Sequence, residues 1–279
     1  GSIHVVEGKN LTLASTTTGN GQLTKSGPGT MRITADPNHT GGTVVEAGTL
    51  ELLHSGSTDG HFLIKSGATL STLPGASTGP LGDAYNITVE SGAIFDIRVN
   101  DTIARLLGGG TVVNNGAAAV TLSVNNTVDA TFDGTINNGT ATLAFTKSGA
   151  NTVTFTGKNT YTGTTTINTG VIRVEGASAR LNGGGLVAVG DNNGNDESLV
   201  LGSNSDVVND LFDKIGDTSE IDFRGSTTAT INGPAAGSTA FTETMGNIDF
   251  RDGVGTFLLN PANGGQLQVN AGTLTRELG

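Results

Sequence analysis

The chain has 279 residues, which is enough for one elongated domain or two globular ones. Its net charge of −11, with only 14 scattered Lys and Arg residues, excludes the clustered positive charge that nucleic acid or an anionic membrane would require. Tryptophan is absent, aromatic residues make up 4% and hydrophobic residues 35%, so the composition favours a long, thin core over a thick one.

The chain shows no targeting signal and contains no cysteine. No window approaches the apolar length of a membrane helix, and no signal peptide is visible. The opening Gly1-Ser2 is typical of a scar left by tag removal, so we interpret the chain as a fragment. The absence of cysteine fits either a reducing cytosol or unfolded passage through an oxidising bacterial periplasm, where an early disulfide would obstruct export.

A short pattern recurs along the chain: a β-branched residue, two variable positions, a glycine and then alternating apolar residues. It occurs at 5–13, 45–52, 64–71, 89–97, 167–174 and 269–278. Gly48, Gly67, Gly92 and Gly116 follow one another at spacings of 19, 25 and 24 residues. This spacing fits one coil of a parallel β-helix, in which glycine turns a corner that a Cβ would oppose. Coils of about 23 residues, stacked about 4.8 Å apart, would give a rod of roughly a dozen coils and about 55 Å.

That interpretation requires vertical columns of equivalent residues. Alternation such as Thr49-Leu50-Glu51-Leu52 places one set of side chains in the core and the other in solvent. Val45, Ile64 and Val89 should then be vertical neighbours inside one column.

A stretch of thirty residues, 23–52, recurs without a gap at 145–174, which is 122 positions later. Ten positions are identical in the two copies: Thr24/Thr146, Lys25/Lys147, Ser26/Ser148, Gly27/Gly149, Thr30/Thr152, Thr34/Thr156, Thr40/Thr162, Gly41/Gly163, Thr43/Thr165 and Gly48/Gly170. Such a repeat is a supersecondary unit that stacks on its neighbours to bury a core, and it generally supplies scaffold rather than an active site.

Weaker correspondences extend the repeat over the rest of the chain. Leu81-Gly82 matches Leu201-Gly202, the segment 101–106 resembles 243–248, and 110–112 resembles 255–257. We therefore predict one continuous solenoid with an initial coil at 1–22, a first module at 23–144 and a second module at 145–279. Because the shift between matching residues grows from 122 to 142, the second module carries an insertion of about twenty residues.

The insertion is predicted to contain one short amphipathic helix, over 205–216. Ser205 and Asp206 supply N-capping oxygens, Gly216 ends the run, and the apolar residues at helical spacing are Val207, Val208, Leu211, Phe212 and Ile215. The apolar stripe should cover either the flank of the rod or a partner, and the flank is the expected place.

If the chain were a sugar-cleaving β-helix, the candidate catalytic carboxylates would be Asp96, Glu220, Asp222 and Asp249. Glu220 and Asp222 share a strand face at about the separation that a glycosidase requires. Arg224 stands on the same face, however, and a cation there would lower the pKa of a carboxyl group that has to act as a general acid. Alternating charges on an exposed strand are commonplace, so we predict no catalytic residue.

The segment 191–198, DNNGNDES, resembles the start of a calcium loop. Its sixth position is Asp196 where glycine is required, and its twelfth is Gly202 rather than Glu. A polar turn between coils is the alternative interpretation, and we predict no resident cofactor. If Ca²⁺ does bind here, the ligands to watch are Asp191, Asn193, Asp196 and Glu197.

The four histidines, His4, His39, His54 and His61, lack metal spacing and are expected at the surface. His39 occupies the place of Tyr161 in the second copy, which indicates a position that accepts any flat polar ring. The glycine runs 108–110 and 183–185 are not phosphate loops, because no Lys-Ser/Thr pair and no predicted helix follows either of them.

The second copy of the long repeat resembles the autotransporter-associated β-strand repeat, also called the passenger-associated transport repeat. The matching residues are Lys147, Gly149, Thr152, Asn159-Thr160-Tyr161-Thr162-Gly163, Thr165 and Gly170. The first copy departs from the pattern with Pro37-Asn38-His39-Thr40 but keeps Gly41-Gly42. The segment 100–115 is similar to those that usually separate such repeats.

This resemblance implies a right-handed parallel β-helix from the passenger of a large Gram-negative protein, displayed at the cell surface or secreted after export through the periplasm. In that family the repeat is associated with efficient export of long passengers. The family shares no catalytic centre, so no functional residue is carried over. Folding that begins at one coil and propagates to the next would suit a chain that emerges end-first through a pore.

Three hypotheses follow from the sequence. The first is a structural stalk that folds vectorially and displays an adhesive or effector region. The second is a binding module, in which the exposed strand face or the 205–216 helix contacts a glycan or a host protein. The third is a polysaccharide-degrading enzyme or phage tailspike, against which stands the near absence of sugar platforms: Tyr85 and Tyr161 are the only tyrosines, and there is no tryptophan.

Overall fold

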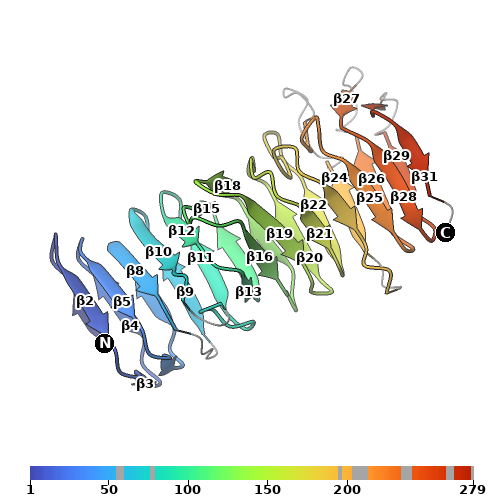
Figure 1. Cartoon of the computed structure of the whole chain (residues 1–279). Coiled ribbons are helices and arrows are strands. Elements are labelled where there is room, and N and C mark those ends of the chain that lie inside the picture. The colour runs from blue at the N-terminus through green and yellow to red at the C-terminus, as the bar shows by residue number, and fades with distance from the viewer. Residues whose placement is uncertain are drawn as a thin grey trace. The chain divides into compact units, whose positions relative to one another are not determined.

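The computed structural model describes residues 1–54, 60–75, 79–193, 197–202, 213–233, 241–261 and 267–277. Within these ranges every regular element is a β-strand and every strand pairing is parallel (Figure 1). The strands form a parallel β-solenoid of about ten turns, which confirms the all-β solenoid prediction with slightly fewer coils than expected. The chain divides into two compact units, 1–125 with 133–143 (unit 1) and 126–132 with 144–279 (unit 2), and each is described by itself.

Unit 1 stacks its strands in successive parallel ladders. One ladder runs in the order β1 (Ser2–His4), β4 (Leu23–Ser26), β7 (Thr43–Val45), β9 (His61–Ile64), β11 (Asn86–Val89) and β14 (Arg105–Gly108). A second runs in the order β2 (Asn10–Leu13), β5 (Thr30–Ile33), β8 (Gly48–Leu52), β10 (Ala68–Thr72), β12 (Ile94–Ile97), β15 (Thr111–Asn114) and β18 (Thr135–Gly139). A short ladder pairs β3 (Thr18–Gly19) with β6 (Asn38–His39), and β13 (Asp101–Ile103) pairs with β16 (Val120–Val124).

Unit 2 repeats this arrangement. One ladder contains β17 (Ala130–Phe132), β20 (Thr152–Phe155), β22 (Val171–Val174), β24 (Ser198–Leu201), β26 (Thr228–Asn232) and β29 (Thr256–Asn260). Another contains β19 (Leu143–Lys147), β21 (Thr165–Ile167), β23 (Val187–Val189), β25 (Ile221–Arg224), β28 (Ile248–Asp252) and β31 (Leu274–Arg276). A short ladder pairs β27 (Phe241–Thr244) with β30 (Leu267–Asn270).

The predicted column of core residues is present. Ile64 is the register partner of both Val45 and Val89, and all three are fully buried. On the second ladder Leu50 stacks on Leu70 in the same way. Stacking like residues over one another in every turn gives the thin core that the composition indicates. Each large apolar side chain that is removed from water stabilises the fold by about 1.5–3 kcal/mol.

The predicted glycine corner is present in both copies of the long repeat at the aligned pair Gly48 and Gly170. Gly48 has a φ of 66°, and a Cβ there would lie 2.5 Å from the carbonyl oxygen of Gly29. Gly170 has a φ of 76°, and its Cβ would lie 2.5 Å from the carbonyl oxygen of Gly149. Both the left-handed backbone and the close approach of the neighbouring turn therefore require glycine.

Most of the helix predicted over 205–216 lies outside the described residues. The four described residues, 213–216, are not helical. In the described part of the chain no helix is long and apolar enough to cross a membrane. The boundary between the two units near 143 falls beside the predicted module boundary at 144, while the three-part division into 1–22, 23–144 and 145–279 stays a prediction.

Candidate functional site

The lysine that both copies of the repeat share is a buried clamp between consecutive turns. Lys25 is fully buried on β4, and its ammonium Nζ donates to the carbonyl oxygen of Gly27 at 2.6 Å. It also donates to the carbonyl oxygen of Ala47, in the following turn, at 2.8 Å. A buried charge is costly unless it is hydrogen-bonded, so this lysine favours a stack in which the next turn is already in place.

The second copy builds the same clamp with Lys147 on β19. Its Nζ donates to the carbonyl oxygen of Gly149, and to that of Thr169, in the following turn, at 3.1 Å. Burial lowers the pKa of Lys147 to about 8, an effect that the carboxylate of Asp129 opposes. Burial likewise lowers the pKa of Lys25. The alignment of the two copies therefore marks a buried polar site, not a surface charge.

A second shared site joins the aromatic position to the threonine four residues later. The hydroxyl of Tyr161 shares a hydrogen bond of 2.7 Å with the Oγ1 of Thr165, and both residues are fully buried. His39 in the first copy places its Nε2 3.0 Å from the Oγ1 of Thr43. The prediction that this position accepts a flat polar ring agrees with these equivalent hydrogen bonds.

Two of the four histidines are buried, which corrects the expectation that all four lie at the surface. His4 and His61 are exposed as predicted, but His39 and His54 retain only 7% and 5% of their surface. For His39 the reason is its repeat position: it fills the buried place of Tyr161, and its Nδ1 also reaches the Oγ1 of Thr17 in the preceding turn at 3.0 Å. His54 lies with its Nδ1 3.7 Å from a carboxylate oxygen of Asp36.

A buried carboxylate forms a second kind of link between turns in both units. In unit 1, Asp101 on β13 accepts the N–H of Leu81 at 3.0 Å and that of Thr102 at 2.9 Å. In unit 2, Glu243 on β27 accepts the N–H groups of Lys214 at 3.0 Å and Ile215 at 3.1 Å. We call each arrangement a carboxylate clasp. The sequence aligned Asp101 with Glu243 but did not indicate what either residue does.

Both clasps have perturbed acidity. Burial raises the pKa of Asp101 to about 7, and the neighbouring carboxylate of Asp83 adds to the increase. Burial raises the pKa of Glu243 to about 8, with a smaller contribution from Asp213. In each case the accepted backbone N–H groups oppose the effect of burial, because they stabilise the ionised form.

The clasps correct one predicted correspondence between the modules. Leu81-Gly82 corresponds structurally to Ile215-Gly216 rather than to Leu201-Gly202, because the N–H groups of Leu81 and Ile215 are both held by a clasp. A turn follows in each case, with Tyr85 N–H donating to Gly82 and Ser219 N–H donating to Gly216. The strand registers show that the shift grows at several places: it is 122 at Thr49/Val171, 129 at Thr69/Ser198, 134 at Ile87/Ile221, 142 at Leu106/Ile248 and 145 at Thr111/Thr256. The extra residues are therefore spread over several turns instead of forming a single insertion.

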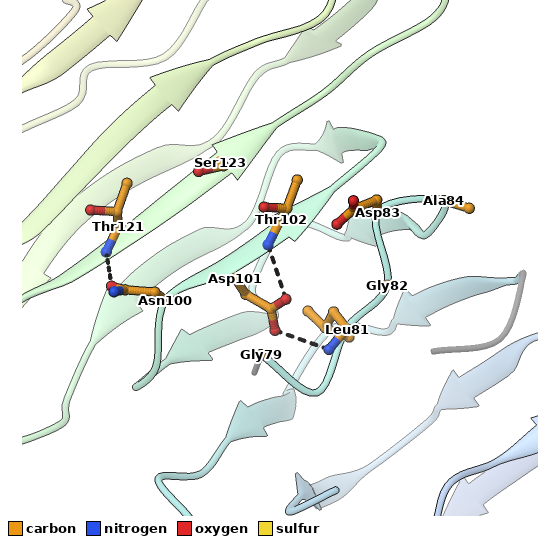
Figure 2. A pocket seen from close by; sticks show the side chains of 10 residues that line it. All are labelled: Gly79, Leu81, Gly82, Asp83, Ala84, Asn100, Asp101, Thr102, Thr121 and Ser123. Carbon is orange, nitrogen blue, oxygen red and sulfur yellow. Dashed lines mark hydrogen bonds between the residues drawn. The ribbon is translucent and has the colours of Figure 1, made fainter. Parts of the chain in front are cut away.

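The clasp of unit 1 borders a pocket of about 680 Å³ (Figure 2). Its lining comes from the segment that precedes β11 and from the outer face of β13 and β16: Gly79, Leu81, Gly82, Asp83, Ala84, Asn100, Asp101, Thr102, Thr121 and Ser123. A Cβ on Gly79 would lie 2.2 Å from the carboxyl carbon of Asp101, so glycine at this position lets the clasp close. No signal in the sequence brought these residues together.

The carboxylates considered for glycan cleavage are engaged in ion pairs and hydrogen bonds. Asp222 is buried, and its oxygens lie 2.8 Å from Arg224 and 2.8 Å from Arg251. Its register partner on β28 is Asp249, which accepts a hydrogen bond from Thr275. Glu220 is exposed and accepts a hydrogen bond of 3.1 Å from the amide of Asn247.

Asp96 has a comparable environment in unit 1. It is buried, pairs with Arg98 at 2.6 Å and accepts the N–H of Asn115 at 2.9 Å. Arrangements of this kind position neighbouring turns, and they bring no pair of free carboxyl groups together for acid–base chemistry.

The suggested calcium loop is only partly described. Asp191 accepts hydrogen bonds from the backbone N–H and from the side-chain amide of Asn193, both at 2.9 Å. Glu197 is buried, whereas Asp196 lies outside the described residues. Among the residues that the structure describes, no group of three or more His, Cys, Asp or Glu side chains could hold a metal ion. Calcium binding at this loop stays untested.

Comparison with known proteins identifies the repeat. Residues 23–52 and 145–174 match the family described as the passenger-associated-transport-repeat, which confirms both predicted copies. The chain is 31% identical, over 196 residues or 68% of its length, to the adhesin BmaC autotransporter of Brucella suis biovar 1 (strain 1330). The alignment spans 5% of that relative's length. No solved structure matches the chain significantly.

Proposed function

We propose, from the premise that this chain is a β-helical passenger segment of the autotransporter type, that it is a stalk which assists export by folding turn by turn. In this proposal the segment displays an adhesive or effector region at the surface of a Gram-negative bacterium, after passage through the periplasm. The absence of cysteine suits that route, because no disulfide can form before translocation.

The observation that carries the proposal is the lysine clamp. In both repeats a buried ammonium donates to carbonyl oxygen atoms of its own turn and to one carbonyl oxygen of the following turn. Strand pairing within each unit likewise joins a turn to the turns directly before and after it. A turn therefore gains its full stabilisation when its neighbour stacks, which favours growth of the solenoid from one end of an emerging chain.

Adhesion is the activity that the name of the relative attaches to that protein. For this chain we propose that adhesion involves a host or cell-surface molecule, either on the region that the stalk supports or on the stalk itself. We propose no glycan-cleaving role, because the tested carboxylates Asp96 and Asp222 are held by arginines.

The test is secretion of the segment as the passenger of an autotransporter reporter. Lys25→Met and Lys147→Met, singly and together, remove the clamp while keeping an unbranched apolar side chain. We expect less passenger at the cell surface, and a smaller protease-resistant fragment, with the largest loss in the double variant. Lys9→Met is the matched control, because Lys9 is exposed.

Unchanged export and unchanged protease resistance in the double variant would contradict a role for the clamp in folding-coupled export. A loss of the same size in the Lys9→Met control would show that lysine content matters instead of the buried clamp.

A further inference from the structure

We propose that the pocket beside Asp101 binds a short uncharged glycan. The proposal goes beyond the scaffold role, because a stalk needs no such site and the lysine clamps lie elsewhere in the fold.

The pocket has a volume typical of ligand sites and two walls that are joined within the fold. Its volume of about 680 Å³ falls within the usual range of roughly 300–1,000 Å³ for small-molecule pockets. One wall is the outer face of β13 and β16, where Thr102 and Ser123 are register partners. The opposite wall is the turn that carries Asp83 and Ala84 (Figure 2). The clasp of Asp101 fixes that turn through the N–H of Leu81, so the two walls are held together without a ligand.

Several polar groups on these walls keep hydrogen-bonding capacity. The Oδ1 of Asn100 accepts the N–H of Thr121 at 2.8 Å, which orients the side chain and leaves its NH₂ group as a donor. The hydroxyl groups of Thr102, Thr121 and Ser123 stand on the outer strand face, where each can donate and accept. The exposed carboxylate of Asp83 adds acceptors from the other side. This mixture matches sugar hydroxyl groups, which also donate and accept.

The charged groups of the pocket disfavour anionic ligands and bare cations. Among the described residues no Lys or Arg lines the pocket, and the carboxylate of Asp83, together with that of Asp101 when it is ionised, would repel phosphates, sulfated sugars and sialylated glycans. A bare cation would need several converging oxygens, but both oxygens of Asp101 already accept backbone N–H groups. The partially positive NH₂ group of Asn100 would also repel such a cation. A neutral polyhydroxyl ligand satisfies these groups without either conflict.

The equivalent place in unit 2 is built differently. Asp217 corresponds to Asp83 in the aligned turn, and its carboxylate lies 3.4 Å from the guanidinium of Arg180. The same guanidinium lies 3.1 Å from Asp213 and donates to the carbonyl oxygen of Ile215. The ion pairs occupy the acidic groups of that turn, so the glycan site is assigned to unit 1.

The experiment is a glycan array probed with the purified chain. The array carries neutral hexose and N-acetylhexosamine oligosaccharides beside sialylated and sulfated ones. Ser123→Trp fills the pocket from the strand face, with Thr88→Trp on β11 as the steric control. Asn100→Asp keeps the acceptor for Thr121 N–H but removes the amide donors, with the exposed Asn10→Asp as the charge control.

We expect the wild type to bind neutral glycans, Ser123→Trp to abolish binding, and Asn100→Asp to weaken it by about tenfold, with both controls unchanged. Circular dichroism melting confirms that each variant is folded, and Asn100→Asp keeps the test decisive if the tryptophan variant does not fold. Binding of anionic glycans alone, binding to no glycan, or binding that survives both pocket variants would overturn the proposal. None of these results bears on the export role, which the lysine variants test separately.

Discussion

The two units place a carboxylate at equivalent positions and surround it differently. Asp101 in unit 1 holds one neighbouring N–H and one on its own strand, whereas the longer Glu243 in unit 2 holds two N–H groups of the neighbouring segment. An open polar pocket lies beside Asp101. In the turn next to Glu243, Arg180 forms an ion pair with Asp217. The comparison shows that the hydrogen bonds between turns persist while the surface around them diverges, so equivalent turns can present different groups to solvent.

The largest expected effect comes from the acidity of the two clasps. The folded-state pKa values of about 7 for Asp101 and about 8 for Glu243 lie above the ordinary 3.8 and 4.5. At any pH between the ordinary pKa of one of these groups and its raised pKa in the fold, the folded protein binds more protons than the unfolded chain. The stabilisation is therefore complete at low pH and is lost as the pH rises through about 7 or 8.

We accordingly expect the unfolding free energy of the wild type, relative to Asp101→Asn, to fall by up to about 4 kcal/mol between pH 4 and pH 8. Glu243→Gln should show the same sign, with its window extending about one pH unit higher. Urea denaturation at a series of pH values measures both. A difference from the wild type that does not vary with pH would mean that these carboxyl groups keep their ordinary acidity in the fold.

Loss of a lysine clamp is expected to cost somewhat less. Lys147→Met leaves the carbonyl oxygens of Gly149 and Thr169 without their donor, at a cost of about 3 kcal/mol. Lys25→Met should behave alike, since its acceptors occupy the equivalent positions. Thermal melting followed by circular dichroism tests this equivalence. A loss confined to one copy would show that the two repeats do not use their lysines in the same way.

A smaller effect is expected at the buried aromatic position of the second copy. Tyr161→Phe removes the partner of the Thr165 hydroxyl and leaves that group unpaired in the core, which should cost about 1–2 kcal/mol. The double variant Tyr161→Phe with Thr165→Val should recover part of the loss, because it removes the unpaired hydroxyl group. If the single variant is as stable as the wild type, the hydrogen bond contributes nothing measurable.

The smallest effect is expected from replacing the buried histidine of the first copy with the tyrosine that the second copy has at that position. His39→Tyr restores the hydroxyl that bonds the threonine four residues later but gives up the contact of Nδ1 with Thr17. We expect a change in stability within about 1 kcal/mol of the wild type, measured by urea denaturation. A loss well above that would show that the site in the first copy is built for histidine.

The parallel solenoid could be predicted because its signals are local or periodic. Alternation in Thr49-Leu50-Glu51-Leu52, corner glycines such as Gly48, and a thirty-residue repeat at a fixed shift all follow from strand geometry and stacking. The column of Val45, Ile64 and Val89 then follows, since equivalent positions in successive coils must overlie one another.

The polar sites could not be predicted in the same way. The burial of the shared Lys25 depends on a hydrogen bond to the carbonyl oxygen of Ala47, 22 residues later, which no local pattern indicates. The burial of His39 was indicated only by its alignment with Tyr161, and the opposite expectation was wrong. The Leu201-Gly202 correspondence failed because dipeptide similarity carries no information about which N–H a distant carboxylate accepts.

The sequence by itself determined the architecture of this protein, because a repeat that places β-branched residues and glycines at coil spacing can bury its apolar side chains only by stacking. The tertiary structure decided which polar groups are buried, which turns they join, and where a pocket opens beside Asp101. Those outcomes depend on contacts between residues about twenty positions apart, where the distance in space is set by the register of the coils rather than by the neighbouring sequence.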